Sequence, residues 1–502
     1  MGPCHDIVFN DLIFESTLSA TSRNLYGLIH CGNNDLERIT FNRCRFTAPQ
    51  AYVNALKFVF DDAPNGGFDI VFNDCVIDGV GRMGIEVQNH GVGTAERYGR
   101  IRWRGGKVVN TGLLGQVSFQ GGSVQVSAGQ TIVGASSAST AVVKAVVLSS
   151  GTWEAGDATG YFVVEDWASQ FANAETIEAN GVVAATCTGF NGNGQAFSFS
   201  GYGLDGEISN CQIENAAYAG IENVGLSHLT VANVTARDLV RGGGGCRPIA
   251  YTHERPMRGG NVTNFQCLTP ASGPVTFANQ IDLRTSHNLF NCSQVIYRGS
   301  RNAKSVQDAY ICSSGPALFC TLAANEGLYT DYNTWTDLDI DHSAAATPFA
   351  MVRFQGANTQ GNRIKGLRFK AASGGAFADN DAGSGPAAGL ASNNFIVGLV
   401  EDYNGQGRPA PTLTFPSDTS YDVSTLSSWP ALTAAPYVTI AGALSATREL
   451  RIPNNIPGRL ALLNTATSPV SVKRTAGGAA ALVHTAATAA VTRSGNDMVL
   501  VG

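Results

Sequence analysis

The stretch Ile39-Thr40-Phe41-Asn42-Arg43-Cys44 introduces the pattern from which the architecture of this chain can be read: an apolar strand, then an asparagine, then a cysteine. The pattern returns at Asn73-Asp74-Cys75, Asn210-Cys211, Asn264-Phe265-Gln266-Cys267 and Asn291-Cys292. A pattern that recurs every one or two coils of chain is typical of a solenoid, whose stacked coils place similar residues at similar positions. Functional residues are then expected among those that point outward from the stack.

The composition favours strands and turns over helices. The 502 residues include 58 glycines, only 14% of them are charged, and the formal net charge is -6. A chain of low charge that is rich in Gly, Asn, Ser and Thr suits β structure with many turns. The negative net charge argues against a nucleic-acid partner, which normally meets a basic face. It suits a neutral glycan, and an acidic glycan stays open because the total can hide a local basic groove.

The eleven cysteines are an odd number, and most have apolar neighbours. We therefore predict that the repeated cysteines are small buried side chains and not a disulfide framework. No matched pair of CxxC motifs is present, so we expect no metal site and no other cofactor. The sequence shows no signal segment and no run of about 18 apolar residues, so we expect no membrane span and folding in a reducing cytoplasm.

Units of strand, turn and strand repeat along the chain. Ile70–Ile77 is followed by Gly84-Ile85-Glu86, and Glu207–Ile213 is followed by Gly220-Ile221-Glu222. Alternate residues of a strand share a face, so each cysteine lies on an apolar face that we expect to be the interior. Repeats of roughly 22–32 residues built from short strands predict a parallel β-solenoid over residues 1–120 and 193–402.

The repeat is interrupted once and then ends. Residues 121–192 are rich in Ser, Ala, Val and Thr, which predicts a small β domain inserted into one coil. Pro409, Pro411, Pro416 and Pro430 predict a linker over 403–436, and the short alternating strands of 437–502 predict a C-terminal β domain for trimerisation or glycan binding. Because β edges of low charge need covering, self-association is expected there. The fold class is thus all-β.

Several phrases resemble known architectures. The Asn-Cys strand followed by Gly-Ile-Glu resembles the right-handed parallel β-helix of the pectate-lyase superfamily. The insert, with Ala128-Gly129-Gln130-Thr131 and Gly151-Thr152-Trp153, is similar to a module of phage virion proteins. The tail, with Arg451-Ile452-Pro453 and Gly458 through Asn464, is similar to the C-terminal β domain of phage tail spikes and fibres.

Together these resemblances imply a tailspike-type polysaccharide depolymerase. Such a protein is a homotrimer on the virion tail, and it binds and cleaves a bacterial surface polysaccharide: a capsule, an exopolysaccharide or an O-antigen. The resemblance also implies synthesis in the bacterial cytoplasm, action outside the cell, and attachment to the phage tail through a segment upstream of the residues given.

Glycan cleavage requires few groups, and two glutamates are suitably placed for it. A hydrolase needs one protonated carboxyl group as acid and a second carboxyl group as base or nucleophile. Glu86 and Glu222 occupy the same place in the Gly-Ile-Glu phrase, so we expect both to point outward, two coil steps or roughly 10 Å apart. That distance is near the upper end for an inverting pair. The alternative is two exposed glutamates on a solvated sheet.

The densest cluster of functional groups in the chain follows the glycine run at 242–245, and it comprises Tyr251, His253, Glu254, Arg255 and Arg258. We expect Glu254 to serve as acid or base, His253 to tune or relay a proton, and the arginines to hold a sugar acid. A lyase acting on a uronic acid would use Tyr251 or His253 as base and Arg255 to neutralise the sugar carboxylate. The alternative is a polar loop with local ion pairs.

Two further groups of acidic residues occur in the chain. Asp205 and Glu207 flank Gly206 and are expected to share a strand face, where like charges would raise one pKa. A turn formed by Asp-Gly is the alternative.

The row Asp337, Asp339 and Asp341 has the residue types of a calcium site. We instead expect Asp339 beside Arg368 and Asp341 beside Lys370 in adjacent coils, as ion pairs.

Three functions therefore remain open: an endo-acting glycoside hydrolase, a polysaccharide lyase acting by β-elimination, and a non-catalytic adhesin that only binds glycan. The predicted catalytic residues are Glu222, Glu254, Asp205 and Glu86, and the predicted substrate-binding residues are Tyr251, His253, Arg255, Arg258 and Glu207.

Overall fold

The computed structural model describes most of the chain up to residue 370 and shorter segments beyond it: residues 4–20, 27–32, 35–91, 95–239, 245–252, 256–321, 329–345, 352–355, 359–370, 378–380, 395–402, 412–414, 421–422, 438–441, 445–452, 459–464, 466, 468–474, 481–483, 488–494 and 497–501. The chain divides into two compact units, Met1–Ser293 and Gln294–Gly502, which are described separately. Within the described residues every regular element is a β-strand, so the all-β prediction is confirmed.

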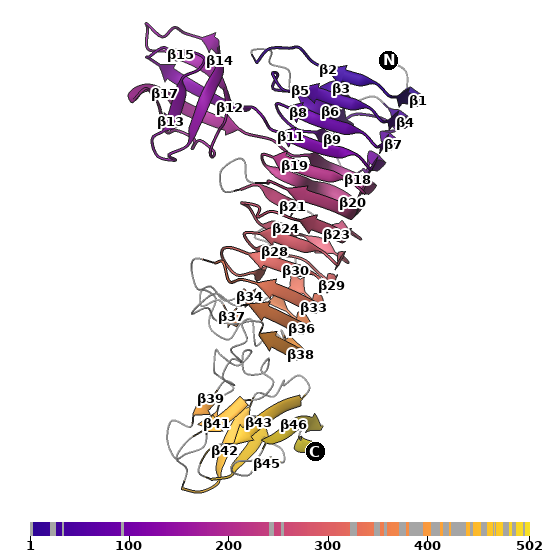
Figure 1. The fold of residues 1–502 in the computed structure, drawn as a ribbon, viewed down its shortest axis with the longest axis vertical. Coiled ribbons are helices and arrows are strands. Elements are labelled where there is room, and N and C mark those ends of the chain that lie inside the picture. The colour runs from indigo at the N-terminus through magenta and orange to yellow at the C-terminus, as the bar shows by residue number, and fades with distance from the viewer. Residues whose placement is uncertain are drawn as a thin grey trace. The chain divides into compact units, whose positions relative to one another are not determined.

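Parallel ladders of strands make up most of the first unit (Figure 1). One ladder contains β1 (Cys4–Asn10), β4 (Leu36–Asn42), β7 (Gly67–Asn73), β10 (Tyr98–Arg104), β18 (Phe197–Ser209), β20 (Ala219–Arg237), β23 (Asn261–Cys267) and β26 (Arg284–Ser286). A second contains β2 (Ile13–Glu15), β5 (Arg45–Ala48), β8 (Val76–Val80), β11 (Lys107–Thr111) and β19 (Gln212–Ala216), and continues through β20 and β23 to β27 (Leu289–Cys292).

A third ladder carries the candidate site. It contains β3 (Gly27–Gly32), β6 (Asn54–Val59), β9 (Ile85–Asn89), the first part of β18, the first part of β20, β21 (Arg247–Tyr251) and β24 (Val275–Ala278). The short strands β22 (Met257–Arg258) and β25 (Gln280–Ile281) pair with each other. Strands that pair in parallel, coil upon coil, are consistent with the predicted β-solenoid.

Aromatic and thiol side chains fill the interior of the first unit. Phe9, Phe41, Phe72 and Trp103 follow one another in four coils, with ring centroids 4.8, 4.9 and 5.4 Å apart. The five cysteines of the repeated pattern are all buried, as predicted: Cys44, Cys75, Cys211, Cys267 and Cys292. The cysteines therefore serve as small apolar core residues.

The asparagines of the pattern stabilise a corner between ladders. The Asn42 amide donates a hydrogen bond of 2.8 Å to Asn10, and the Asn73 amide donates one of 2.9 Å to Asn42. The next residues, Arg43 and Asp74, have φ values of 53° and 52°, in the left-handed region. Each coil bends there, and the amide ladder ties successive bends together. This explains the asparagines before Cys44 and Cys75. Asn210 and Asn264 themselves have left-handed φ values of 54° and 51°, and they are linked through Asn233, which donates to Asn210 and accepts from Asn264.

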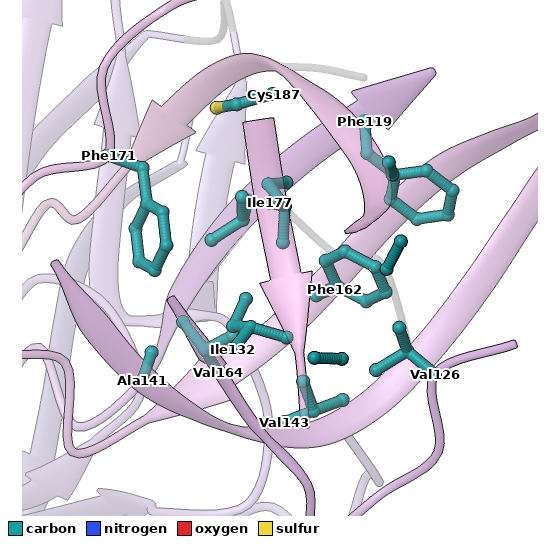
Figure 2. Packing of buried hydrophobic residues seen from close by; sticks show 14 of the residues in the cluster. Phe119, Val126, Ile132, Ala141, Val143, Phe162, Val164, Phe171, Ile177 and Cys187 are labelled. Atoms are coloured by element: carbon teal, nitrogen blue, oxygen red, sulfur yellow. The ribbon is translucent and has the colours of Figure 1, made fainter. Parts of the chain in front are cut away.

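A closed antiparallel barrel lies between β11 and β18 in the sequence. Its strands are β12 (Gly115–Gly122), β13 (Thr131–Gly134), β14 (Thr140–Ser150), β15 (Ala158–Glu165), β16 (Thr176–Ala179) and β17 (Val182–Asn191). They begin a few residues before the insert expected at 121–192. Figure 2 shows the barrel core, in which the rings of Phe119 and Phe162 stack 4.3 Å apart.

The barrel packs against the coils through a small apolar cluster. Tyr52 and Leu114 of the coils share this cluster with Tyr161 and Val163 of the barrel. The Tyr52 hydroxyl also donates a hydrogen bond of 3.0 Å to the carbonyl of Asn191.

The chain enters and leaves the barrel at neighbouring points of one coil. The Thr111 hydroxyl, before the barrel, donates a hydrogen bond of 2.7 Å to the carbonyl of Gly194, after it. A Cβ placed on Gly112 would lie 2.6 Å from the Gly194 Cα, so the two connections touch.

The second unit contains further parallel ladders. Its strands are β28 (Val295–Arg298), β29 (Lys304–Val306), β30 (Ala309–Cys312), β31 (Leu318–Thr321), β32 (Thr330–Asp331), β33 (Thr334–Asp341), β34 (Val352–Phe354), β35 (Thr359–Gln360), β36 (Arg363–Lys370), β37 (Ala378–Asn380) and β38 (Phe395–Asp402). Two sheets follow, formed by β39 (Thr412–Thr414), β41 (Val438–Ala441), β43 (Arg459–Asn464), β46 (Thr488–Ser494) and β47 (Asp497–Val501), and by β40 (Tyr421–Asp422), β42 (Arg448–Ile452), β44 (Val470–Arg474) and β45 (Ala481–Val483). The segment expected as a linker thus contains β39 and β40.

The register of the second unit confirms the expected charge pairs. Asp339 lies opposite Arg368 and Asp341 lies opposite Lys370, with nitrogen-to-oxygen distances of 2.6 and 3.7 Å. Asp337 has a φ of 52° and lies at a bend. Among the described residues, no three His, Cys, Asp or Glu side chains are placed to hold a metal ion.

Candidate active site

Glu86 and Glu222 lie in one row across the third ladder. Lys57 of β6 is opposite Glu86 of β9, Glu86 is opposite Ser198 of β18, and Ser198 is opposite Glu222 of β20. The two glutamates are therefore separated by two strand spacings, about 9.6 Å between backbones. The predicted stacking of Glu86 and Glu222 is confirmed, and Ser198 occupies the position between them.

Glu86 is surrounded by donors. Its Oε2 atom lies 3.0 Å from Nζ of Lys57 and 3.1 Å from Nη1 of Arg82, and it accepts a hydrogen bond of 2.7 Å from the amide of Asn54. The residue is only 8% exposed. Burial acts to raise its pKa, but the charges of Arg82 and Lys57 and the hydrogen bonds from Lys57 and Asn54 outweigh burial and hold the pKa below its ordinary value. Glu86 is thus an ionised carboxylate.

Glu222 has the opposite electrostatic environment. Its Oε2 atom accepts hydrogen bonds of 2.8 Å from the Gln195 amide and 3.0 Å from the Ser198 hydroxyl. Burial raises its pKa, and the negative charge of Glu86 adds to the effect. The two hydrogen bonds and the charge of Arg247 act in the other direction without overcoming burial. Glu222 therefore retains a proton to higher pH than an ordinary glutamate.

The row has the elements of acid–base chemistry. One carboxyl group is held ionised and the other is biased toward its protonated form, a division that acid–base catalysis by two carboxyl groups requires. Arg247 adds a positive charge beside Glu222, and its guanidinium lies 5.8 Å from the ring centroid of Tyr218. Such a difference between neighbouring carboxyl groups is typical of functional sites, although ion-pair networks also produce it.

Asp205 and Glu207 form a second acidic pair on the outer face of the first ladder. Arg104 lies 2.6 Å from Glu207, and Arg102 lies 3.9 Å from Asp205 and 4.0 Å from Glu207. The hydrogen bond from Arg104 is the main reason why the pKa of Glu207 is lowered. The raised pKa expected from like charges is therefore not found at Glu207. The sequence prediction had not included the two arginines, which lower the pKa of this carboxyl group. Asp205 has a φ of 67°, so it lies at a bend and does not follow strand alternation.

The cluster expected around residue 251 is only partly described. Tyr251 is fully buried, with its ring packed edge-on against Phe277 at 5.6 Å, and burial raises its pKa well above the ordinary value. A fully buried side chain cannot reach a substrate, so the structure does not support the predicted roles of Tyr251 as lyase base and substrate contact. Arg258 is exposed on β22, and its backbone amide donates to the Ser227 hydroxyl at 3.3 Å. His253, Glu254 and Arg255 lie outside the described residues.

Sequence reasoning missed five polar partners of the two glutamates: Asn54, Lys57, Arg82, Gln195 and Ser198. A signal for two of them was present. Ala55-Leu56-Lys57 and Ala196-Phe197-Ser198 have the same order of small, large apolar and polar residue as Gly84-Ile85-Glu86 and Gly220-Ile221-Glu222. Aligning these triplets would have placed Lys57 and Ser198 in the row. Asn54, the first residue of β6, and Gln195, just before β18, each directly precede such a triplet. The glutamate-bearing phrases have Met83 and Ala219 at that position, so the phrase gave no signal for a polar partner there.

No protein-family model matches this chain, and no curated protein sequence matches it significantly. The fold and the carboxylate row therefore define only a class: an all-β protein of stacked parallel strands with an acidic pair on one ladder. In the part of the chain that the structure describes, no helix has the length and apolar character needed to cross a membrane.

Proposed function

We propose that this protein is a virion tailspike that cleaves a bacterial surface polysaccharide as an endo-acting glycoside hydrolase. The observation that carries the proposal is the pairing of Glu86 and Glu222 in one row, with pKa values shifted in opposite directions. The stacked parallel strands support it, because equivalent positions on successive coils form an extended face suited to a polymer.

In this proposal Glu222 is the general acid and Glu86 is the general base. Glu222 protonates the glycosidic oxygen of the leaving sugar, and Glu86 takes a proton from the water that attacks the anomeric carbon from the opposite face. The backbones of the two residues are two strand spacings, about 9.6 Å, apart, and Ser198 lies between them, which leaves room for that water. Lys57 and Arg82 keep Glu86 ionised, and Gln195 and Ser198 orient the carboxyl group of Glu222.

The wider proposal rests on the sequence resemblance. It comprises a right-handed coil, a homotrimer, and attachment to a phage tail through an upstream segment. The low-charge β-strands of 437–502 support self-association, because their edges need covering. Light scattering on the purified protein tests the trimer, and a monomeric mass would contradict it.

A specific observation favours the adhesin as second candidate. Glu86 is 8% exposed, and all of its described donors converge on one oxygen, as in a structural ion cluster. On this alternative the row stabilises the coils and the outer faces bind glycan without cleaving it. The burial of Tyr251 removes one of the two bases considered for a lyase.

The products of the reaction separate the candidates. Purified protein is incubated with capsules and lipopolysaccharides from a panel of bacteria. A hydrolase releases oligosaccharides with new reducing ends, whereas a lyase also leaves an unsaturated end that absorbs ultraviolet light. Glu222→Gln is expected to slow cleavage about 10²–10⁴-fold. Glu154→Gln, at an exposed barrel residue, is the matched control. Full activity of Glu222→Gln and Glu86→Gln would reject the assigned pair, and binding without products would establish the adhesin.

A further inference from the structure

A cavity of about 350 Å³ opens on the outer face of the first coils, in the ladder that contains β1, β4, β7 and β10. It belongs to a different ladder from Glu86 and Glu222, and nothing in the proposed reaction uses it. The side chains that matter for its chemistry are His5, Asp35, Glu37, Asn65, Phe68 and Arg100. They come from four successive coils.

The cavity contains an outward-facing aromatic ring. His5, Glu37 and Phe68 are opposite one another in register, and the next residue in the row is Gly99. A Cβ on Gly99 would lie 3.2 Å from the Phe68 ring, so the glycine leaves room for that ring. Phe68 is half-buried, whereas its counterparts His5 and Glu37 in the preceding coils are exposed. The guanidinium of Arg100 lies 5.2 Å from the Phe68 ring centroid.

Fixed hydrogen-bond acceptors stand beside the ring. Asp35 accepts hydrogen bonds of 2.8 and 3.1 Å from the backbone amides of Asn65 and Gly66, and one of 2.7 Å from the Asn65 side chain. The bond from the Asn65 backbone is the main reason why the pKa of Asp35 is lowered. Glu37 is paired with Arg38 at 2.6 Å. Asp35 is therefore an acceptor whose position is set before a ligand arrives, and Glu37 is a second acceptor beside it.

The charges select the class of ligand. Asp35 and Glu37 contribute two negative charges, and the one arginine of the cavity is already paired with Asp69 at 2.7 Å. An anionic ligand is thus disfavoured, and among the described residues no cluster fit for a metal ion occurs here. An aromatic face beside carboxylates that accept hydrogen bonds suits a ligand with one apolar face and a rim of hydroxyl groups.

We propose that this cavity binds one uncharged sugar ring, a hexose or an N-acetylhexosamine, as a non-catalytic subsite for the glycan. The C–H face of the sugar packs on Phe68, and its hydroxyl groups donate to Glu37 and Asp35. The identification of the ligand as part of a glycan rests on the proposed function. A second contact with the glycan would raise the effective concentration of the glycan at the row of Glu86 and Glu222.

Calorimetry and crystal soaks with D-glucose, D-galactose and N-acetyl-D-glucosamine test the proposal, with D-glucuronate as the anionic comparison. At least one uncharged sugar is expected in the cavity of the intact chain, and D-glucuronate is expected to bind more weakly. Phe68→Ala is expected to weaken binding about tenfold or more. Phe68→Tyr retains the ring and should retain binding, which controls for damage to the fold. The Glu154→Gln variant, changed at an exposed position of the barrel, should bind the sugars as the unmodified chain does.

Two results would overturn the proposal: an empty cavity with all three uncharged sugars, or equal binding by Phe68→Ala. The outcome is independent of catalysis. Sugar in the cavity of a protein that cleaves nothing would retain the subsite and reject the hydrolase. Cleavage by a protein whose cavity stays empty would reject the subsite and retain the hydrolase.

Discussion

The hydroxyl of Ser198 donates a hydrogen bond of 3.0 Å to Oε2 of Glu222, and the strand register places Ser198 between Glu222 and Glu86. The bond favours the ionised form of Glu222 and so acts against the burial that raises its pKa. Ser198 is therefore a positioning residue that also tunes the proposed acid. This relationship gives the reaction a pH signature that an inert ion cluster would lack.

We predict a bell-shaped pH dependence of kcat/KM. Activity requires ionised Glu86, whose pKa is held below the ordinary 4.5, so the acid limb lies below that value. It also requires protonated Glu222, whose pKa is raised above 4.5, so activity falls as the pH rises through that higher pKa. Glu222→Gln is expected to lower kcat about 10²–10⁴-fold. Initial rates of reducing-end formation across pH measure both limbs, and a profile without an alkaline limb contradicts the assignment.

Ser198→Ala should move the alkaline limb to higher pH. The substitution removes a hydrogen bond that lowers the pKa of Glu222, so the carboxyl group keeps its proton longer. The acid limb should stay in place, because the Ser198 hydroxyl bonds Glu222, whereas Glu86 is bonded by Asn54, Lys57 and Arg82. Ser118→Ala, in barrel strand β12, is the matched control and should leave the profile unchanged. A uniform loss of rate at every pH would show instead that Ser198 acts only on structure.

Lys57→Met should destabilise the first unit and shift the acid limb. It removes one of the two cations at the buried Glu86, at an expected cost of about 1–3 kcal/mol. The pKa of Glu86 should rise, so the acid limb moves to higher pH. Because the folded-state pKa of Glu86 is depressed, its stabilising contribution is present above the unfolded value of 4.5 and is lost as the pH falls through the folded value.

Urea unfolding at neutral pH measures the loss in free energy of unfolding caused by Lys57→Met. Lys107→Met, at an exposed position of β11, is the control and should be within about 0.5 kcal/mol of the unmodified protein. Equal stability of the two variants would show that Arg82 and Asn54 alone satisfy Glu86.

Glu175 should be the acid-sensitive residue of the barrel. Its carboxylate accepts bonds from the backbone amide and hydroxyl of Ser137 at 2.9 and 2.8 Å and from the Ala172 amide. Burial acts to raise its pKa, but these bonds lower it overall. Glu175→Gln replaces an acceptor oxygen by an amide donor and should cost about 1–3 kcal/mol. Calorimetric melting should show the loss, and it should shrink as the pH falls below the unfolded pKa, near 4.5.

The asparagine ladder predicts a graded loss of stability. Asn42 both donates to Asn10 and accepts from Asn73, whereas Asn10 only accepts. Asn42→Ala should therefore cost about 1–2 kcal/mol, roughly twice the cost of Asn10→Ala. Chemical unfolding of the two variants measures the difference. An equal cost would mean that neighbouring side chains or water replace the lost bonds.

Much of the architecture could be predicted from the sequence, because local chemistry dictates it. A thiol is small enough for the narrow interior of a coil, and an asparagine suits the corner where it bonds its equivalent in the next coil. The pairing of Asp339 with Arg368 followed from register alone. These features depend on one residue type at one repeated position, so a single sequence reveals them.

The candidate site was harder to predict, for two physical reasons. Asp205 has a left-handed backbone, so counting alternate residues did not give its direction. Gln195 and Arg82 come from corners whose path depends on the whole coil.

Tyr251 was a different case, because strand alternation does apply to it. It shares its face with Ile249, and both are buried inside the coil. A consistent use of the two-residue period would have placed it in the core.

The touching connections at Gly112 and Gly194 have a consequence for how such proteins diversify. An inserted domain whose two connections leave and rejoin a coil at one position does not disturb the strand pairing of that coil. β11, just before the barrel, still pairs with β8 and β19. We therefore expect that recombination can exchange, shorten or remove the inserted barrel while the stacked coils keep their strand pairing. We expect relatives with a different inserted domain at this position to retain the row that contains Glu86 and Glu222.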